Sequence, residues 1–177
     1  DLRNVAIANV KTNYTILLDI DFVPSSNFAE MLTDWSEFFT ADMSQPAVFV
    51  VPAFETHSKL TPAPRNKAEV LKAVKEGTVT PVHEHFKPAH GATNFSHWYG
   101  TNMPYMATYQ YMFEPYFVAP QTAPLFTTQF AGYGNDKSSY SYELATADYQ
   151  FWVLPDVFIT HMYHEKAAWA KSTDIVE

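Results

Sequence analysis

Apolar residues recur at helical spacing in four segments of the chain, and this pattern predicts helices at residues 2–12, 27–39, 66–76 and 139–147. Ser26 or Asn27 would cap the second helix, and Gly77 would end the third. One face of the first helix carries Leu2, Val5, Ala6 and Asn9. The apolar stripe of the second consists of Phe28, Met31, Leu32, Trp35 and Phe38.

Shorter apolar runs, bounded by proline or acidic residues, are typical of buried strands. They occur at residues 14–18, 47–51, 116–119, 151–154 and 157–160. The segment 78–105 is irregular and rich in histidine, proline and aromatic residues. Because strands alternate with helices, we expect one α/β domain over residues 1–177, layered around a mostly parallel or mixed central sheet.

Composition and charge narrow the possible functions. Of 177 residues, 47% are hydrophobic and 17% are charged, against roughly 25% charged in an average soluble domain, so the chain is expected to fold. Eleven Lys and Arg against 19 Asp and Glu give a net charge of −8, which argues against a nucleic-acid partner and against docking on an anionic membrane. The lack of cysteine excludes disulfides, Cys-ligated zinc and thiol nucleophiles.

Asp19 and Asp21 directly follow the first predicted strand. Residues two apart on an extended strand point to the same face, so both carboxylates would reach one cation. Two carboxylates with open coordination positions suit Mg²⁺ or Mn²⁺, which would bridge to a diphosphate. Two solvated acids at a strand end are the alternative interpretation.

The last predicted strand ends just before His161, and His164 follows three residues later. Either imidazole could complete the coordination of a divalent ion begun by Asp19 and Asp21, because neutral imidazole is an acceptable ligand for Mn²⁺. The alternative is an ordinary surface or capping histidine at a strand end.

A second group of histidines follows Gly77. Gly77, five intervening residues and then His83-Glu84-His85 match the opening half of a cupin metal motif, but the glutamate expected three or four residues beyond His85 is missing. A histidine-ligated metal enzyme centred on His83, His85 and His90 is therefore an alternative hypothesis. Hydrogen-bonding histidines in a long loop are the simpler interpretation.

The segment 130–137 is predicted to be a glycine-hinged loop. Glycines let the backbone approach a ligand closely, and Asp136 or Glu143 beyond them could serve as a base. Neither a Walker pattern nor a dinucleotide fingerprint is present, which argues against a phosphate loop. A turn with charged flanks is the competing interpretation.

Seven segments, occurring together and in one order, make the chain resemble glycosyltransferase family 49. They are LRNVA (2–6), LLDIDF (17–22), VVPAFE (50–55), HGATNFSHW (90–98), FEPYFV (113–118), FAGYGNDK (130–137) and VLPDVFITHMYH (153–164). The family includes the β-1,4-glucuronyltransferase of O-mannosyl glycans and the second catalytic domain of the LARGE-type dystroglycan-modifying enzymes. The similarity is closer to the LARGE-type domain, through PAFE, TNF and FEPY.

The resemblance implies a GT-A fold, a nucleotide-binding α/β sandwich in which an Asp-x-Asp motif holds a UDP-sugar through Mn²⁺ (or Mg²⁺). Asp19 and Asp21 match that motif, and a histidine near the chain end matches its third protein ligand, with His161 preferred over His164. Members invert stereochemistry, converting an α-linked UDP-glucuronate donor to a β-glucuronoside on a glycan acceptor.

The resemblance also suggests roles for residues outside the metal motif. Arg3 would pair with the donor phosphates or carboxylate, and Asn94 and Gly134 stand in matching segments and would line the donor site. An inverting enzyme needs a general base, for which the candidates are Asp136, ranked first, Glu143 and Glu114. Aromatic residues that would stack on an acceptor glycan, or else pack in the core, are Trp98, Tyr99, Tyr105, Tyr109 and Tyr111.

The chain departs from the family pattern in two places. Asn135 and Asp136 stand where related sequences often have an apolar or aromatic residue and then Asn, which leaves the donor sugar open and keeps an inactive glycan-binding relative as an alternative. The strand and helix that normally build the uridine pocket are absent before residue 2. We therefore expect the chain to be the carboxyl-side portion of a catalytic domain.

Localisation is predicted from the family and from two sequons, at Asn13 and Asn94. Both indicate the secretory pathway, and the family implies the Golgi lumen, with the parent chain as a possible type II membrane protein. The segment itself is expected to make no membrane contact and to carry no targeting signal.

Overall fold

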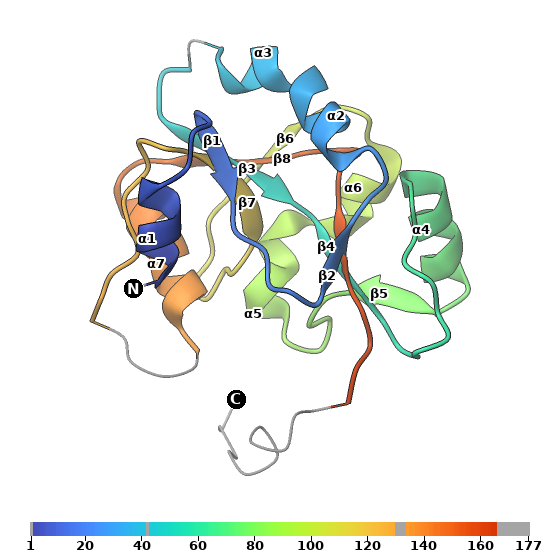
Figure 1. Ribbon diagram of the computed structural model, residues 1–177. Helices are drawn as coiled ribbons and strands as arrows, with labels where there is room; N and C mark the ends of the chain where they lie inside the picture. Colours follow the sequence, from blue (N-terminus) through green and yellow to red (C-terminus); the bar gives the residue numbers. More distant parts are fainter. Residues whose placement is uncertain (1, 42, 130–133, 166–177) are drawn as a thin grey trace.

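The structure is a computed structural model and describes residues 2–41, 43–129 and 134–165. It is a mixed α/β fold with two sheets and helices packed around them (Figure 1). The first sheet has the strand order β1-β7-β3-β8-β6 and the second has the order β2-β9-β4-β5. Each contains one parallel pair among antiparallel ones, so the prediction of a mixed sheet is confirmed, with two sheets in place of one.

The first sheet is built around β3, which has β7 on one side and β8 on the other. Its strands are β1 (Tyr14–Ile16), β3 (Ala47–Val51), β6 (Tyr105–Ala107), β7 (Tyr116–Pro120) and β8 (Gln150–Val153). Every residue of β3 is buried, as expected for an uninterrupted apolar run. Val48 and Val50 pack in one core cluster, and Phe49 and Val51 pack in another on the opposite face.

The second sheet continues the first, because the chain passes from β3 to β4 through Pro52 alone. Its strands are β2 (Phe22–Pro24), β4 (Ala53–Thr56), β5 (Val79–Pro81) and β9 (Ile159–His161). A longer link, residues 154–158, joins β8 to β9. The two sheets are therefore joined at two places, where β3 continues into β4 and where β8 leads to β9. Strands β4 and β9 run parallel at the centre of the second sheet.

The predicted helices are present with changed ends. The helices are α1 (Leu2–Ala8), α2 (Phe28–Asp34), α3 (Ser36–Phe39), α4 (Lys67–Lys75), α5 (Lys87–His90), η1 (Gly91–Thr93), α6 (Phe95–Gly100) and α7 (Asp136–Thr146). The second predicted helix is divided at Trp35, and its apolar stripe packs against the core cluster that contains Phe49. Helix α4 begins after an Asn66 cap and ends before Gly77, at φ 68°. The irregular segment contains four short elements, β5, α5, η1 and α6.

Helix α1 turns a different face inward from the one that its apolar spacing suggests. Ile7 is buried, whereas the side chains of Leu2 and Val5 are 87% and 59% exposed. Arg3 and Asn4 lie on the inward side, where the Asn4 amide bonds with the backbone of Phe126 in both directions, at 2.8 and 3.0 Å. This orientation brings Arg3 to α7, beside α1 in Figure 1.

Candidate functional site

Strand pairing places Asp21 beside the end of β9. Phe22, the first residue of β2, lies opposite His161 in the antiparallel register. The Met162 N–H donates to the Asp21 carbonyl at 3.0 Å, which extends that pairing by one residue on each strand. The backbone therefore fixes the position of Asp21 against the histidines that follow β9.

The three side chains of Asp21, His161 and His164 converge. The Asp21 Oδ2 is 3.2 Å from Nε2 of His161 and 3.2 Å from Nε2 of His164. Their ligand atoms all lie within 4.8 Å of one another, and within the described residues this is the only group of three or more His, Cys, Asp or Glu that could hold a metal ion. Two imidazoles and a carboxylate form a donor set that suits Mn²⁺.

The second oxygen of Asp21 supports a cation at this position. Asp21 Oδ1 is buried and has no hydrogen-bond partner within the described residues. A buried carboxylate oxygen is costly to leave unpaired, and a bound cation would satisfy it. We refer to Asp21, His161 and His164 as the carboxylate–histidine cluster.

The two histidines are held differently. His161 ends β9, its side chain is 25% exposed, and its ring lies 5.2 Å from that of Phe22. The His164 side chain is 53% exposed and lies beyond the sheet. A hydrogen bond to the Glu165 carbonyl and then the contact with Asp21 raise the pKa of His164. The cluster therefore combines one histidine at the end of a strand with a second, more exposed one.

Asp19 is turned away from the carboxylate–histidine cluster. Its Oδ2 accepts hydrogen bonds from Lys137 Nζ at 2.5 Å and from the Tyr116 hydroxyl at 2.7 Å. The strand expected over residues 14–18 ends at Ile16, and residues 17–21 form a loop and turn, so the alternation of a strand does not apply to the two aspartates. The structure brings Asp21 to the histidines and Asp19 to a lysine; metal ligation by Asp19 stays a prediction.

The surroundings of Asp19 shift its own pKa and that of Tyr116. Burial alone would raise the pKa of Asp19, but hydrogen bonds from Lys137 and Tyr116 outweigh it, and the charges of Lys137 and Arg3 add to the net lowering. Burial, and then the bond to Asp19, raise the pKa of the Tyr116 hydroxyl well above its usual range. Asp19 is therefore ionised and Tyr116 is neutral at physiological pH.

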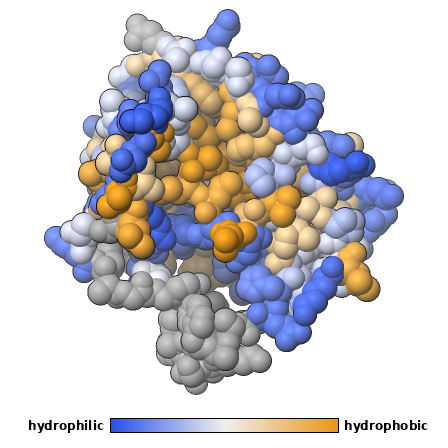
Figure 2. Space-filling view, viewed as in Figure 1, coloured by the Kyte–Doolittle hydropathy of each residue, from blue (hydrophilic) through white to orange (hydrophobic). Residues whose placement is uncertain are grey.

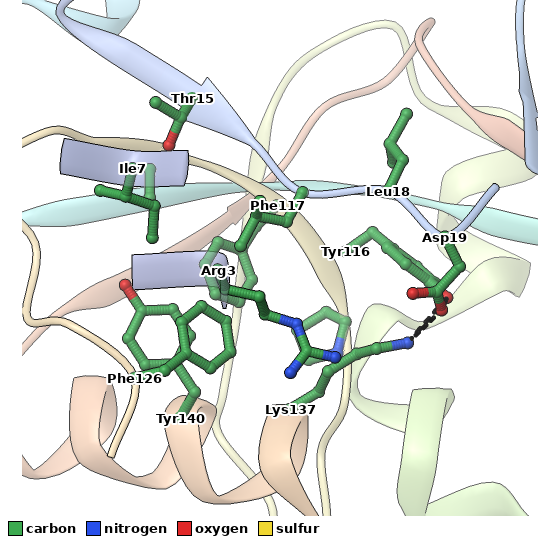
Figure 3. A pocket seen from close by; sticks show the side chains of 13 residues that line it. Arg3, Ile7, Thr15, Leu18, Asp19, Tyr116, Phe117, Phe126, Lys137 and Tyr140 are labelled. Atoms are coloured by element: carbon green, nitrogen blue, oxygen red, sulfur yellow. Dashed lines mark hydrogen bonds and ion pairs between the residues drawn. The ribbon is translucent and has the colours of Figure 1, made fainter. Parts of the chain in front are cut away.

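A pocket with a cavity volume of about 140 Å³ opens beside Asp19. Figure 3 shows Arg3 from α1 and Lys137 from α7 reaching into the same region, with Asp19 and Tyr116 across from them. The remaining lining is Ile7, Thr15, Leu17, Leu18, Pro115, Phe117, Ala119, Phe126 and Tyr140. On the face drawn in Figure 2, apolar side chains gather centrally and hydrophilic ones surround them. The pocket thus has a charged end and an apolar body.

One of the predicted residues, Arg3, lies at the charged end of this pocket, next to a second, Asp136. Arg3 forms an ion pair with Asp136 at 2.5 Å and lies over the Phe126 ring at 5.3 Å. Asp136 is the first residue of α7, where a carboxylate is favoured by the helix dipole. Asn135 precedes it with φ 61°, a left-handed conformation that asparagine tolerates better than apolar residues do. The unusual Asn135-Asp136 pair therefore starts a helix.

The three candidate bases are placed differently. Asp136 is engaged by Arg3, and Glu143 lies two turns further along α7, about 10 Å along the helix axis. Glu114 is half-buried; burial raises the pKa of its carboxyl, the charge of Lys137 opposes this, and the charges of Asp136 and Asp19 add to it. Glu114 therefore has the raised pKa that a general base needs, close to the charged end of the pocket.

Asn94 and Gly134, two residues predicted to bind the donor, each lie next to the start of a helix. Asn94 caps α6, where its side-chain oxygen accepts from the His97 N–H at 3.3 Å. Gly134 has φ 96° and leads into α7. Neither lines the pocket beside Asp19 in the described part of the chain. Residues 130–133 of the predicted glycine-hinged loop lie outside the described residues.

The predicted histidine-ligated centre at His83, His85 and His90 is not supported. His83 and His85 were expected to share a strand face, but β5 ends at Pro81 and both lie in the turn that follows. The ring of His90 is 6.0 Å from that of His83, and His90 is buried while the other two are exposed. Burial, and then the charges of His83 and Lys137, lower the pKa of His90 to about 3. His90 is a neutral core histidine.

The aromatic residues proposed for acceptor stacking divide into two groups. Trp98 is fully buried, and its indole N–H donates to the Leu154 carbonyl at 2.8 Å. The Tyr105 hydroxyl donates to the Thr93 carbonyl at 2.6 Å. Tyr111 is 81% exposed. Core packing therefore accounts for Trp98, and Tyr111 is free to contact a ligand.

Lys137, Tyr116 and Phe22 were not singled out from the sequence, although all three stand in the motif segments. The Phe22 ring lies 4.6 Å from that of Tyr116 and also contacts that of His161. It therefore links the Asp19 network to the carboxylate–histidine cluster. Their presence in those segments was the available signal, and their contacts became visible only with the fold.

The mixed α/β architecture, with its two mixed sheets, is compatible with a GT-A-like glycosyltransferase domain. The chain belongs to the family described as glycosyl-transferase for dystroglycan, whose profile matches residues 1–174. The fold class predicted from the sequence and the resemblance to family 49 are both confirmed.

Individual relatives agree with that assignment. The chain is 35% identical over 164 residues to the xylosyl- and glucuronyltransferase LARGE2 of Mus musculus, 37% over 165 residues to LARGE2s of Gallus gallus, and 34% over 165 residues to LARGE1 of Homo sapiens. Each match covers 92% of this chain and 24%, 22% and 22% of the respective relative. The chain thus spans about a quarter of the length of these relatives.

Proposed function

We propose that this chain forms part of a metal-dependent, inverting glycosyltransferase that moves a sugar from a UDP-sugar to a glycan acceptor, and that the sugar is glucuronate. The observation that carries the proposal is the convergence of Asp21, His161 and His164 on one point. Family membership supports sugar transfer, and the names of the relatives include glucuronyl transfer.

The residues that would hold the cation are Asp21 and His161, with His164 as a more exposed ligand and Asp19 as a further carboxylate. Two imidazoles favour Mn²⁺ over Mg²⁺, which prefers oxygen ligands. When bound, the ion would act as a Lewis acid that offsets the negative charge developing on the departing diphosphate. The unpaired Asp21 Oδ1 supports this assignment.

Cationic side chains would hold the anionic donor. Arg3 and Lys137 line the same end of the pocket beside Asp19. A guanidinium suits planar carboxylates and phosphates, and an ammonium acts as a point charge. UDP-glucuronate presents both a diphosphate and a carboxylate, which matches this pair.

Glu114 is our first choice for the base that deprotonates the acceptor hydroxyl. Its pKa is raised by burial, whereas Asp136 is already paired with Arg3. A higher pKa makes a carboxylate a stronger base, and a base poised near the working pH is the most effective. Asp136 would instead orient Arg3.

We further propose that the protein acts in the Golgi lumen, on a glycan carried by a protein. This rests on the family and on the two sequons at Asn13 and Asn94. Within the residues that the structure describes, no helix has the length and apolarity to cross a membrane.

The test is a turnover assay of the full-length protein with a panel of UDP-sugars, with and without Mn²⁺. We expect turnover with UDP-glucuronate that depends on the ion, and a β-linked product. Turnover with a different UDP-sugar would correct the donor alone. Binding of UDP-sugar without turnover on any acceptor would contradict catalysis and indicate a glycan-binding relative.

A further inference from the structure

Lys137 forms an ion pair with Asp19, a carboxylate that would help to hold the cation in the proposed function. Its Nζ is 2.5 Å from Asp19 Oδ2 and 3.0 Å from the Tyr116 hydroxyl oxygen, and it lies 4.7 Å from the centre of the Tyr116 ring. The Lys137 side chain is 24% exposed and that of Asp19 is 45% exposed. The ammonium group is therefore the more enclosed partner of this ion pair.

Both contacts of Asp19 with its neighbours use the same oxygen, Oδ2. A cation bound by Asp19 through Oδ2 would compete with the Lys137 ammonium, because two positive charges at one oxygen repel each other. Ligation by Asp19 through Oδ2 thus requires that Lys137 withdraw, and ligation through Oδ1 would still place the cation next to the Lys137 ammonium.

Withdrawal of Lys137 would leave a largely enclosed positive charge at the pocket. An enclosed charge without a partner is strongly unfavourable. Of the other carboxylates near Lys137, Asp136 is already engaged by Arg3 at 2.5 Å, and Glu114 is half-buried with a pKa raised by burial. An anionic group of the ligand in the pocket would meet the requirement, since Lys137 lines the pocket together with Arg3.

We propose that Lys137 is an exchangeable counter-ion, which neutralises Asp19 in the free protein and binds an anionic group of the donor when Asp19 takes part in holding the cation. This inference rests on the proposed function. It makes cation binding and donor binding mutually dependent, and such coupling is reciprocal, each ligand strengthening the other by the same factor.

The experiment is a calorimetric titration of the full-length protein with Mn²⁺, without and with saturating UDP, in the wild type and in Lys137→Met. We expect removal of the competing ammonium to tighten Mn²⁺ binding in the absence of UDP by about tenfold. If Lys137 binds the diphosphate, UDP binding at saturating Mn²⁺ should weaken by about tenfold, so that the coupling between the two ligands shrinks.

A double-mutant cycle tests the role of Asp19. Because Lys137 acts on Mn²⁺ binding through Asp19, Lys137→Met should change Mn²⁺ affinity in the wild-type background and leave it unchanged in an Asp19→Asn background. Lys72→Met, on the exposed side of α4, removes the same charge elsewhere and should change none of these affinities. Thermal unfolding of each variant checks that the fold is kept.

Replacing UDP by UDP-glucose and UDP-glucuronate identifies the anion. If the diphosphate is the partner of Lys137, Lys137→Met weakens the binding of UDP, UDP-glucose and UDP-glucuronate equally. If the sugar carboxylate is the partner, Lys137→Met weakens the binding of UDP-glucuronate most. Unchanged Mn²⁺ affinity and coupling in Lys137→Met would overturn the inference while leaving the proposed function intact. A wild type that binds neither Mn²⁺ nor UDP would overturn both.

Discussion

Phe22 on β2 lies directly opposite His161 on β9, and the centres of their rings are 5.2 Å apart. Asp21 immediately precedes Phe22, so the register that pairs these two residues also presents the Asp21 carboxylate to the His161 ring at 3.2 Å. The backbone ladder, and not a flexible side-chain contact, thus assembles a site from residues 140 positions apart.

Asp21→Asn should abolish metal-dependent transfer without unfolding the protein. The amide keeps the shape of the side chain but removes the charge that a cation requires. Because Asp21 Oδ1 is buried without a partner in the described residues and Oδ2 contacts two part-exposed imidazoles, loss of that charge should lower the free energy of unfolding by no more than about 1 kcal/mol. Initial rates with UDP-sugar and Mn²⁺, together with denaturant unfolding, measure both effects.

The same assay on Asp19→Asn tests the role of the other aspartate. We expect it also to abolish metal-dependent transfer, since Asp19 is proposed as a further ligand. Retention of more than about a tenth of wild-type activity by either variant would contradict its role in holding the cation.

Glu114→Gln should lower kcat by about 10²- to 10⁴-fold, the usual contribution of a general base, with little change in donor binding. Asp136→Asn should act mainly on KM, because it releases Arg3. Burial raises the pKa of Glu114 above its ordinary value of 4.5, so activity should fall with decreasing pH at a point above pH 4.5. The reverse ranking of the two kcat values would make Asp136 the base.

Trp98 provides a prediction on the core. Trp98→Ala should cost about 3–5 kcal/mol in the free energy of unfolding, because it leaves a cavity and removes the bond to the Leu154 carbonyl. Tyr111→Ala, at an 81% exposed position, should cost less than about 0.5 kcal/mol. Urea unfolding curves of the two variants provide the comparison, and equal losses would contradict the assignment of Trp98 to the core.

His90 should make the protein sensitive to acid. Burial lowers its pKa to about 3, against 6.5 in the unfolded chain, so between these values the unfolded state binds a proton that the folded state does not. Stability from this residue is therefore complete above pH 6.5 and is lost as the pH falls towards 3.

His90→Gln removes that titration. Its free energy of unfolding should decrease less steeply with falling pH than that of the wild type, by at most about 1.4 kcal/mol per pH unit. Chemical unfolding at several pH values between 7 and 4 tests this, with each protein referred to its own value at pH 8. Parallel profiles would show that His90 accepts a proton in the folded state.

Much of the fold could be predicted because many strands and helix ends depend on residues that are close together in the sequence. The apolar run of β3 was predicted to be a buried strand, and the helix predicted at residues 66–76, ended by Gly77, matches α4 to within one residue at each end. For α1 the same reasoning failed: its most apolar face is exposed, and the inward face follows from contacts of Arg3 and Asn4 with distant residues.

The site was predictable in its residue types and only partly in its geometry. Asp21, His161 and His164 were named from their positions at strand ends, and the structure brings them together. The position of Asp19 depends on β1 ending early and on Lys137, 118 residues away. Such a contact is decided by the packing of α7 against the sheet, which no local pattern in the sequence encodes.

The most direct test of the account is Mn²⁺ titration calorimetry on the full-length wild type, His161→Ala and His164→Ala. His161 is fixed by the sheet and His164 is the more exposed ligand, so His161→Ala should weaken Mn²⁺ binding more than His164→Ala does. Equal affinity in all three proteins would show that no cation binds between Asp21 and these imidazoles, and would contradict the proposed metal site.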